Sequence, residues 1–151
     1  MIAAVLDTHT VIWLLHADAR LSHRALQAIE TAAAQQMQVA ISSISLVETA
    51  YLEEKGRIPI GTLHGLLELL DKPESQLVEA PVSRNIVASL LSISRETVPD
   101  MPDRVIAATA LSLAVPVIRG SVRLPAWLHD IKLAGNAGLV GVTVPVSCRG
   151  M

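Results

Sequence analysis

The sequence is poor in the residues that build disulfide or zinc sites. It contains one cysteine, Cys148, in 151 residues, which excludes an internal disulfide framework and predicts an intracellular, cytoplasmic protein. Its five histidines include no pair with the H-x-x-x-H spacing of a two-ligand metal site. No G-x-S-x-G elbow is present either, so nothing supports a nucleophilic serine.

Aromatic residues, long apolar runs and excess positive charge are also lacking. With no phenylalanine, one tyrosine and two tryptophans, the chain has little material for stacking on nucleic-acid bases. No run approaches the roughly 18 apolar residues of a membrane helix, and the apolar opening 2–6 has no basic segment before it, unlike a signal peptide. The formal net charge of −2 argues against an extended nucleic-acid surface, although that count omits any metal held by carboxylates.

What the chain does contain is aliphatic residues in alternating strand and helix patterns. Hydrophobic residues make up 51% of the sequence, enough for one core, and we find no repeat or linker, so we expect a single domain over 1–151. The order of elements predicts an α/β fold with a mainly parallel sheet. Strands are expected at 2–6, 39–44, 77–82 and 115–118, with a weaker candidate at 139–146. Helices are expected at 11–15, from a cap at Ser22 to 33, from Ser45 to about 56, and at 63–70, 86–91 and 103–113.

Three acids follow or flank the expected strands. Asp7 ends the first strand, Glu48 lies one turn into the helix after the second, and Asp103 opens the helix before the fourth. The carboxyl ends of parallel strands share one edge of a sheet, so these acids are expected to meet there. Carboxylates forced together repel unless a cation holds them. Their hard oxygen atoms favour Mg²⁺ or Mn²⁺.

Each acid also has a purely structural interpretation. Ser45 and Glu48 match the S-x-x-E capping box, in which the glutamate only satisfies a backbone N–H. Asp100 and Asp103 match a helix cap followed by proline and a first-turn acid. Asp7 is an N-cap candidate for the helix that follows it, although an acid directly after a buried strand is costly without a partner.

Three segments together resemble PIN-domain ribonucleases, with the closest similarity to the VapC toxins of toxin–antitoxin pairs. They are Leu6-Asp7-Thr8-His9, the segment 42–48 (SSISLVE) and the segment 102–110 (PDRVIAATA). The resemblance covers about residues 2–118. It implies an α/β/α sandwich around a central, mainly parallel sheet of four to five strands. It also implies a metal-dependent endoribonuclease that uses Mg²⁺ or Mn²⁺, forms a homodimer and is inhibited by a small cognate antitoxin.

The same resemblance suggests roles for individual residues. The metal-binding and catalytic acids would be Asp7, Glu48 and Asp103, with Asp100 as an auxiliary ligand. The hydroxyls of Thr8 and Ser43 would orient these acids or their waters, unless they are ordinary cap hydroxyls. The side chains near the acidic edge that could contact RNA phosphates are Arg104, Arg119 and Arg123, for which solvated charges at element ends are the alternative.

The chain departs from the family pattern after its fourth strand. These toxins commonly continue there with a Thr/Ser-Arg-Asp-like sequence whose acid is the fourth of the cluster, whereas this chain reads Arg119-Gly120-Ser121. Asp130 is the nearest downstream acid, but its surroundings do not match the motif. A changed reading frame near codon 119 and true divergence are both open explanations for the atypical tail 119–151.

The departure leaves two further hypotheses about function. A catalytically degenerate PIN domain would keep the fold and a protein partner but not the chemistry, and Gly120 favours it. An unrelated phosphate-transfer or receiver-like domain is disfavoured, because the first strand offers one aspartate rather than an acidic pair and no lysine follows a late strand.

Overall fold

The computed structural model of the chain describes residues 1–120. The elements follow in the order β1 (Ile2–Leu6), α1 (Thr8–Leu15), α2 (His23–Ala34), β2 (Gln38–Ser42), α3 (Ser43–Glu54), α4 (Thr62–Asp71), β3 (Leu77–Ala80), α5 (Arg84–Leu90), α6 (Met101–Leu113) and β4 (Val117–Ile118). This alternation of strands and helices confirms the predicted α/β class.

Within the described part of the chain, the strands form one parallel sheet in the order β3-β2-β1-β4. The central strand β1 pairs on one side with β2, where Val5 is opposite Ala40, and on the other with β4, where Val5 is opposite Val117. Because all four strands run in the same direction, the residues that follow β1, β2 and β4 come to the same edge of the sheet.

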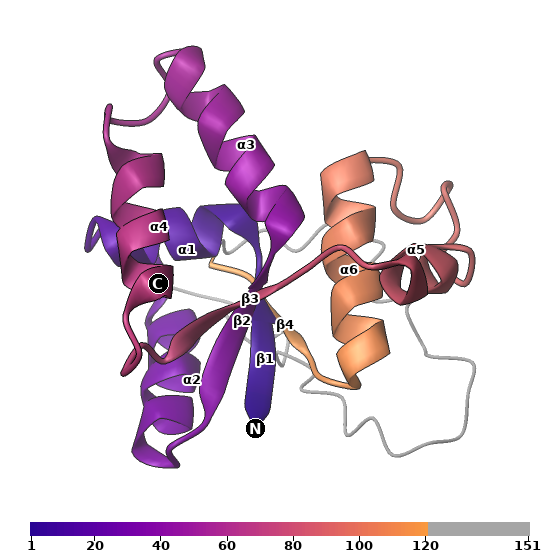
Figure 1. The fold of residues 1–151 in the computed structure, drawn as a ribbon, viewed down its shortest axis with the longest axis horizontal. Helices are drawn as coiled ribbons and strands as arrows, with labels where there is room; N and C mark the ends of the chain where they lie inside the picture. Colours follow the sequence, from indigo (N-terminus) through magenta and orange to yellow (C-terminus); the bar gives the residue numbers. More distant parts are fainter. Residues whose placement is uncertain (121–151) are drawn as a thin grey trace, which may run out of the picture.

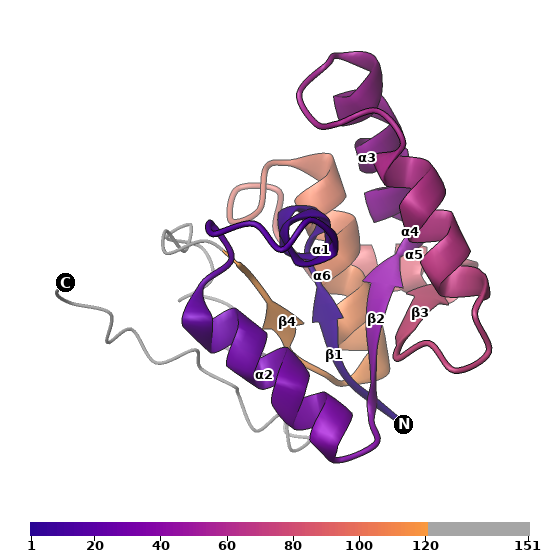
Figure 2. The same ribbon diagram turned by 90° about the vertical axis from the view of Figure 1, so that its left-hand side faces the viewer.

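Helices cover both faces of this sheet, which gives the expected three layers (Figure 1). Successive residues of β1 point to opposite faces. Leu6 packs in a core with residues of α1, α2 and α4, whereas Val5 packs on the other face with Ile106 and Ala110 of α6. Figure 2 shows α1 and α2 on one side of the sheet and α6 on the other. Strand β1 is therefore covered by helices on both faces.

Several predicted boundaries were wrong by one to three residues, each for a local reason. The second strand ends at Ser42 rather than Ile44, because the Ser42 hydroxyl accepts from the Ile44 N–H and caps α3. The third strand ends at Ala80 rather than at 82, since Pro81 has no N–H for a ladder. Helix α6 begins at Met101 rather than at 103, because Asp100 is its N-cap.

Some predictions lie outside the described residues. They are the strand candidate at 139–146, Asp130 and Arg123. Within residues 1–120, no helix combines the length and apolar character that crossing a membrane requires.

Candidate active site

Asp7 stands where β1 passes into α1, and each of its carboxylate oxygens faces a different group. Oδ1 accepts from the backbone N–H of Thr10 at 2.8 Å and from the Thr10 hydroxyl. This is an N-cap, as the structural interpretation predicted. Oδ2 lies 3.9 Å from Nε of Arg119. The cap therefore fixes the carboxylate and leaves its second oxygen turned toward a cation.

Glu48 reaches the same region from α3 and is held by a hydroxyl of α1. Its Oε1 accepts from Oγ1 of Thr8 at 2.5 Å, and that Oγ1 also lies 3.0 Å from Oγ of Ser45. Since the threonine hydroxyl has one proton, it donates to the carboxylate and accepts from Ser45. Thr8 and Ser45 are both buried, with exposed fractions of 2% and 0%.

These contacts rule out the capping-box interpretation of Glu48. Helix α3 begins two residues before Ser45, and its N-cap is Ser42. Ser45 is therefore inside the first helical turns, where its hydroxyl faces Thr8 instead of an unpaired N–H. The carboxylate of Glu48 is turned across to another element of the fold.

Asp103 occupies the first turn of α6, and the cap of that helix is a different residue. Asp100 accepts from the backbone N–H of Asp103 through Oδ2 at 3.2 Å and so serves as N-cap. Asp103 uses its own Oδ1 for an ion pair, 3.5 Å from Nη2 of Arg119. With Asp100 as the cap, the side chain of Asp103 is available to the acidic edge.

Arg119 links the first and last of these acids. It follows β4 directly, its guanidinium pairs with both Asp7 and Asp103, and its side chain is only 7% exposed. Asp7 and Asp103, which come from distant elements, thus share one cation, whereas the role of the three acids as metal ligands stays a prediction. Arg119 was predicted as a phosphate contact, but in this arrangement it faces inward to the carboxylates.

Burial, followed by nearby carboxylates, raises the pKa values of Glu48 and Asp103. Burial raises the pKa of Glu48, the Thr8 hydrogen bond opposes that change, and the nearby charges of Asp103 and Asp100 raise it further. Burial also raises the pKa of Asp103, against the lowering effect of Arg119, while Asp100 and Asp7 raise it. Mutual repulsion of this kind is what a bound cation would relieve.

Other predicted residues point away from this cluster. The Ser43 hydroxyl donates to Oε1 of Glu79 at 2.6 Å, so it does not contact the three acids. Arg104 donates through Nη2 to the backbone carbonyls of Leu90 and Ile93, at 3.1 and 2.9 Å. These contacts tie α6 to the segment around α5 and engage Nη2 of the guanidinium.

Two hydroxyls that hold the acids were missed from the sequence. Thr10 supports Asp7, and Ser45 supports the Thr8–Glu48 contact. Thr10 has a recognisable signal, because it lies three residues after an aspartate that caps a helix. Ser45 was considered only as a helix cap, since the predicted start of α3 was two residues late.

The donor set has the chemistry of a Mg²⁺ or Mn²⁺ site, although its present arrangement is not a formed one. Carboxylate oxygens are the ligands these ions prefer, and the guanidinium of Arg119 lies between Asp7 and Asp103. Among residues 1–120, however, no three or more histidine, cysteine, aspartate or glutamate side chains lie close enough together to hold a metal ion. The residues fit the ion in kind, and Arg119 occupies the place between two of them.

Gly120, where the family pattern has its fourth acid, is tightly enclosed. A Cβ atom built there would lie 2.9 Å from Cε3 of Trp13 and 3.1 Å from both Cδ1 of Leu21 and Oγ1 of Thr10. The backbone carbonyl of Gly120 also accepts from the N–H of Ser22 at 3.0 Å. The space next to Gly120 is thus filled by the side chains of Trp13, Leu21 and Thr10.

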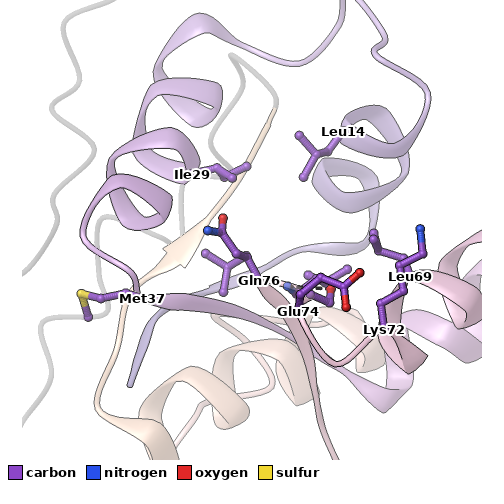
Figure 3. Close-up of a pocket in the computed structure, with 10 residues that line it drawn as sticks. Leu14, Ile29, Met37, Leu69, Lys72, Glu74 and Gln76 are labelled. Atoms are coloured by element: carbon purple, nitrogen blue, oxygen red, sulfur yellow. Dashed lines mark hydrogen bonds between the residues drawn. The ribbon is translucent and has the colours of Figure 1, made fainter.

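A surface pocket lies at the opposite end of the sheet and has a different character. Figure 3 shows Leu14, Ile29 and Leu69 around it, with Lys72 and Glu74 nearby. The pocket is lined by residues of α1, α2 and α4 and by the amino ends of β2 and β3. Its largely apolar walls contain none of the three acids.

Comparisons with known proteins agree with this architecture. The family described as PIN domain matches residues 4–120. A VapBC2 complex from Rickettsia felis, solved with a DNA fragment from its promoter, has a similar fold at 20% identity and a TM-score of 0.55, over 78% of this chain and 86% of that one. A toxin–antitoxin complex from Klebsiella pneumoniae gives 22% identity and a TM-score of 0.49, over 76% and 83%. A comparison with curated proteins gave no match.

Proposed function

This chain belongs to the PIN domain family, and on that premise we propose that it is a metal-dependent endoribonuclease and the toxin of a toxin–antitoxin pair. The family is one of nucleases. The observation that carries the proposal is that Arg119 pairs with both Asp7 and Asp103 at one edge of the sheet, where the charge of Asp103 also raises the pKa of Glu48. Hydrolysis of a phosphodiester bond at such an edge needs a divalent cation to offset the negative charge of the acids and the substrate.

In this proposal Asp7, Glu48 and Asp103 hold the ion, and the neighbouring hydroxyls orient them. When bound, Mg²⁺ or Mn²⁺ supplies Lewis-acid polarisation of the phosphate. Thr10 fixes the rotamer of Asp7, while Thr8 fixes Oε1 of Glu48 and leaves its other oxygen for the ion. Such supporting hydrogen bonds typically affect metal affinity or activity by about 10- to 100-fold.

RNA is the proposed substrate, in single-stranded or loop form. Unpaired segments can bend so that a phosphate reaches recessed carboxylates, whereas a duplex holds its phosphates on a rigid cylinder. The scarcity of aromatic residues favours recognition through the backbone rather than through base stacking.

The proposed partners are a small antitoxin and a second copy of the chain. Support for an antitoxin comes from the similar fold of the Rickettsia felis VapBC2 structure. An arginine of the partner would bind the acidic edge, because a guanidinium pairs with carboxylates in a bidentate manner. The product of a neighbouring small gene should therefore suppress cleavage when mixed with this chain.

The function is tested with purified full-length chain, Mn²⁺ and a single-stranded RNA. We expect cleavage that falls by about 100-fold or more in Asp7→Asn, Glu48→Gln and Asp103→Asn, because each amide removes a negative charge from an ion that contributes several kcal/mol to the transition state. Asp71→Asn and Glu68→Gln, on the exposed side of α4, are the matched controls. Full cleavage by all three amide variants would refute the carboxylate mechanism.

A catalytically degenerate PIN domain is the second candidate. It is favoured by the arginine between Asp7 and Asp103 and by the enclosed Gly120. A parent chain that binds the neighbouring gene product but cleaves neither RNA nor DNA with Mn²⁺ would establish this alternative. Preferential cutting of duplex DNA would instead support nuclease activity but refute RNA as the substrate.

A further inference from the structure

Arg119 occupies a buried position at the centre of the candidate active site. Its side chain is 7% exposed, compared with 13% for Asp7 and 32% for Asp103. Nε lies 3.9 Å from Oδ2 of Asp7, and Nη2 lies 3.5 Å from Oδ1 of Asp103. The most buried charge of this group is thus a cation located between two carboxylates.

The backbone on either side of Arg119 is anchored to the first part of the chain. The carbonyl of Ile118 accepts from the N–H of Asp7 at 3.1 Å, and the carbonyl of Gly120 accepts from the N–H of Ser22 at 3.0 Å. Ser22 also caps α2. Because these hydrogen bonds fix residues 118 and 120, Arg119 enters the acidic edge as part of the folded framework.

A guanidinium and a hard divalent ion require the same carboxylate oxygens. Arginine binds carboxylates through charge-assisted N–H donors directed at the oxygen lone pairs, and Mg²⁺ or Mn²⁺ binds those lone pairs directly. Both also relieve the repulsion between Asp7 and Asp103. Binding of a metal ion is therefore less favourable at acids that are already paired with Arg119 than at acids with no internal counter-ion.

We propose that Arg119 is an internal counter-ion that competes with the divalent cation for Asp7 and Asp103. The resting chain is then closed to metal by its own arginine, and metal enters only as the guanidinium leaves these carboxylates. The inference rests on the proposed metal-binding role of the two aspartates. It predicts weak metal binding by the parent chain, together with a metal-free fold that is stable because the acids are already paired.

The test compares Arg119→Gln with the full-length parent chain, using Mn²⁺ alone as the probe. Glutamine keeps an amide donor but removes the charge. We expect Arg119→Gln to bind Mn²⁺ about tenfold more tightly in calorimetric titration, which corresponds to about 1.4 kcal/mol. Its thermal midpoint should be lower than the parent's in EDTA and rise more on addition of Mn²⁺.

Two further variants isolate the effect. Arg119→Lys keeps a positive charge and should bind Mn²⁺ less tightly than Arg119→Gln. Arg20→Gln removes an arginine whose partner is Asp18, outside the acidic edge, and should bind Mn²⁺ like the parent. Equal or weaker Mn²⁺ binding by Arg119→Gln would overturn the inference. If that variant is unfolded in EDTA, refolding by Mn²⁺ supports the inference, and failure to refold contradicts it.

Binding and cleavage separate this inference from the proposed function. If the parent chain cleaves RNA with Mn²⁺ but Arg119→Gln does not bind Mn²⁺ more tightly, the proposed nuclease function is supported and the counter-ion role of Arg119 is refuted. If Arg119→Gln binds Mn²⁺ more tightly but neither chain cleaves RNA, the counter-ion role of Arg119 is supported and the proposed nuclease function is refuted.

Discussion

The hydrogen bond from Thr8 to Glu48 offers a direct measure of how the site is stabilised. Thr8→Val keeps the shape of this buried side chain but removes the only proton that it gives to Oε1 of Glu48, at 2.5 Å. A hydrogen bond to a charged group contributes about 1.5–3 kcal/mol. We therefore expect the free energy of unfolding at pH 7 to fall by about that amount, measured by urea denaturation with an unchanged m-value.

The pH dependence of this loss identifies its source. The Thr8 hydroxyl lowers the pKa of Glu48, whose net pKa is nevertheless above its ordinary value of 4.5, so Thr8→Val raises that pKa further. A carboxyl with a raised folded pKa stabilises the fold below the unfolded pKa and loses that stabilisation as pH rises. The deficit of Thr8→Val should thus be small near pH 4 and grow as the pH rises above 4.5.

A buried threonine elsewhere provides the matched control. Thr109 is fully buried in α6, and its hydroxyl donates to the carbonyl of Val105 at 2.7 Å. That carbonyl is a neutral acceptor, so Thr109→Val should cost about 1 kcal/mol and show no change between pH 4 and 7. The reasoning would be refuted if the Thr8→Val deficit were independent of pH, or no larger than that of Thr109→Val. Thr8→Ser should recover most of the loss.

Two other predictions concern the acids and the glycine at the end of β4. Glu48→Gln should raise the thermal midpoint in EDTA at pH 7, because it removes the charge of a carboxyl group whose pKa is raised by burial and repulsion. This gain should vanish near pH 4, where the carboxyl group is protonated. Glu68→Gln is the control, and a lowered midpoint of Glu48→Gln at pH 7 would contradict the expected repulsion. Gly120→Ala should cost about 1–3 kcal/mol, because the new Cβ meets the Trp13 ring. Gly65→Ala, in the middle of α4 with its nearest contact at 3.8 Å, should instead stabilise by about 0.5–1 kcal/mol in the same urea titration. Equal effects of the two glycine substitutions would show that residue 120 is not enclosed.

The arrangement of the strands and the three acids could be predicted because it depends on short, local patterns. Continuous apolar runs fixed the strands, and a parallel sheet brings their carboxyl ends together without any knowledge of packing. Asp7 was predictable for the same reason, since it directly follows such a run. The position of Asp7 directly after β1 was therefore predictable from the sequence, whereas its role as a metal ligand stays a prediction.

The details that sequence could not give depend on contacts between distant elements. Ser43 and Ser45 both flank the start of α3, and only the position of the helix start, set by Ser42, decides that Ser45 faces Thr8 while Ser43 faces Glu79. The inward direction of Arg119 similarly follows from the pairing of β4 with β1 and from the Ser22–Gly120 hydrogen bond. Neither relationship has a local signature.

Helix capping and a role in the site are not alternatives for these acids, because a carboxylate has two oxygens and a helix start can use two acids. Asp7 caps α1 with Oδ1 and presents Oδ2 to a cation. At α6 the same two tasks are divided, since Asp100 caps the helix and Asp103 pairs with Arg119. Capping holds Asp7 in one rotamer and fixes the backbone from which Asp103 projects, so it reduces the entropy cost of gathering charged side chains. The cap motifs that seemed to compete with the functional interpretation are therefore part of how the fold positions its acids.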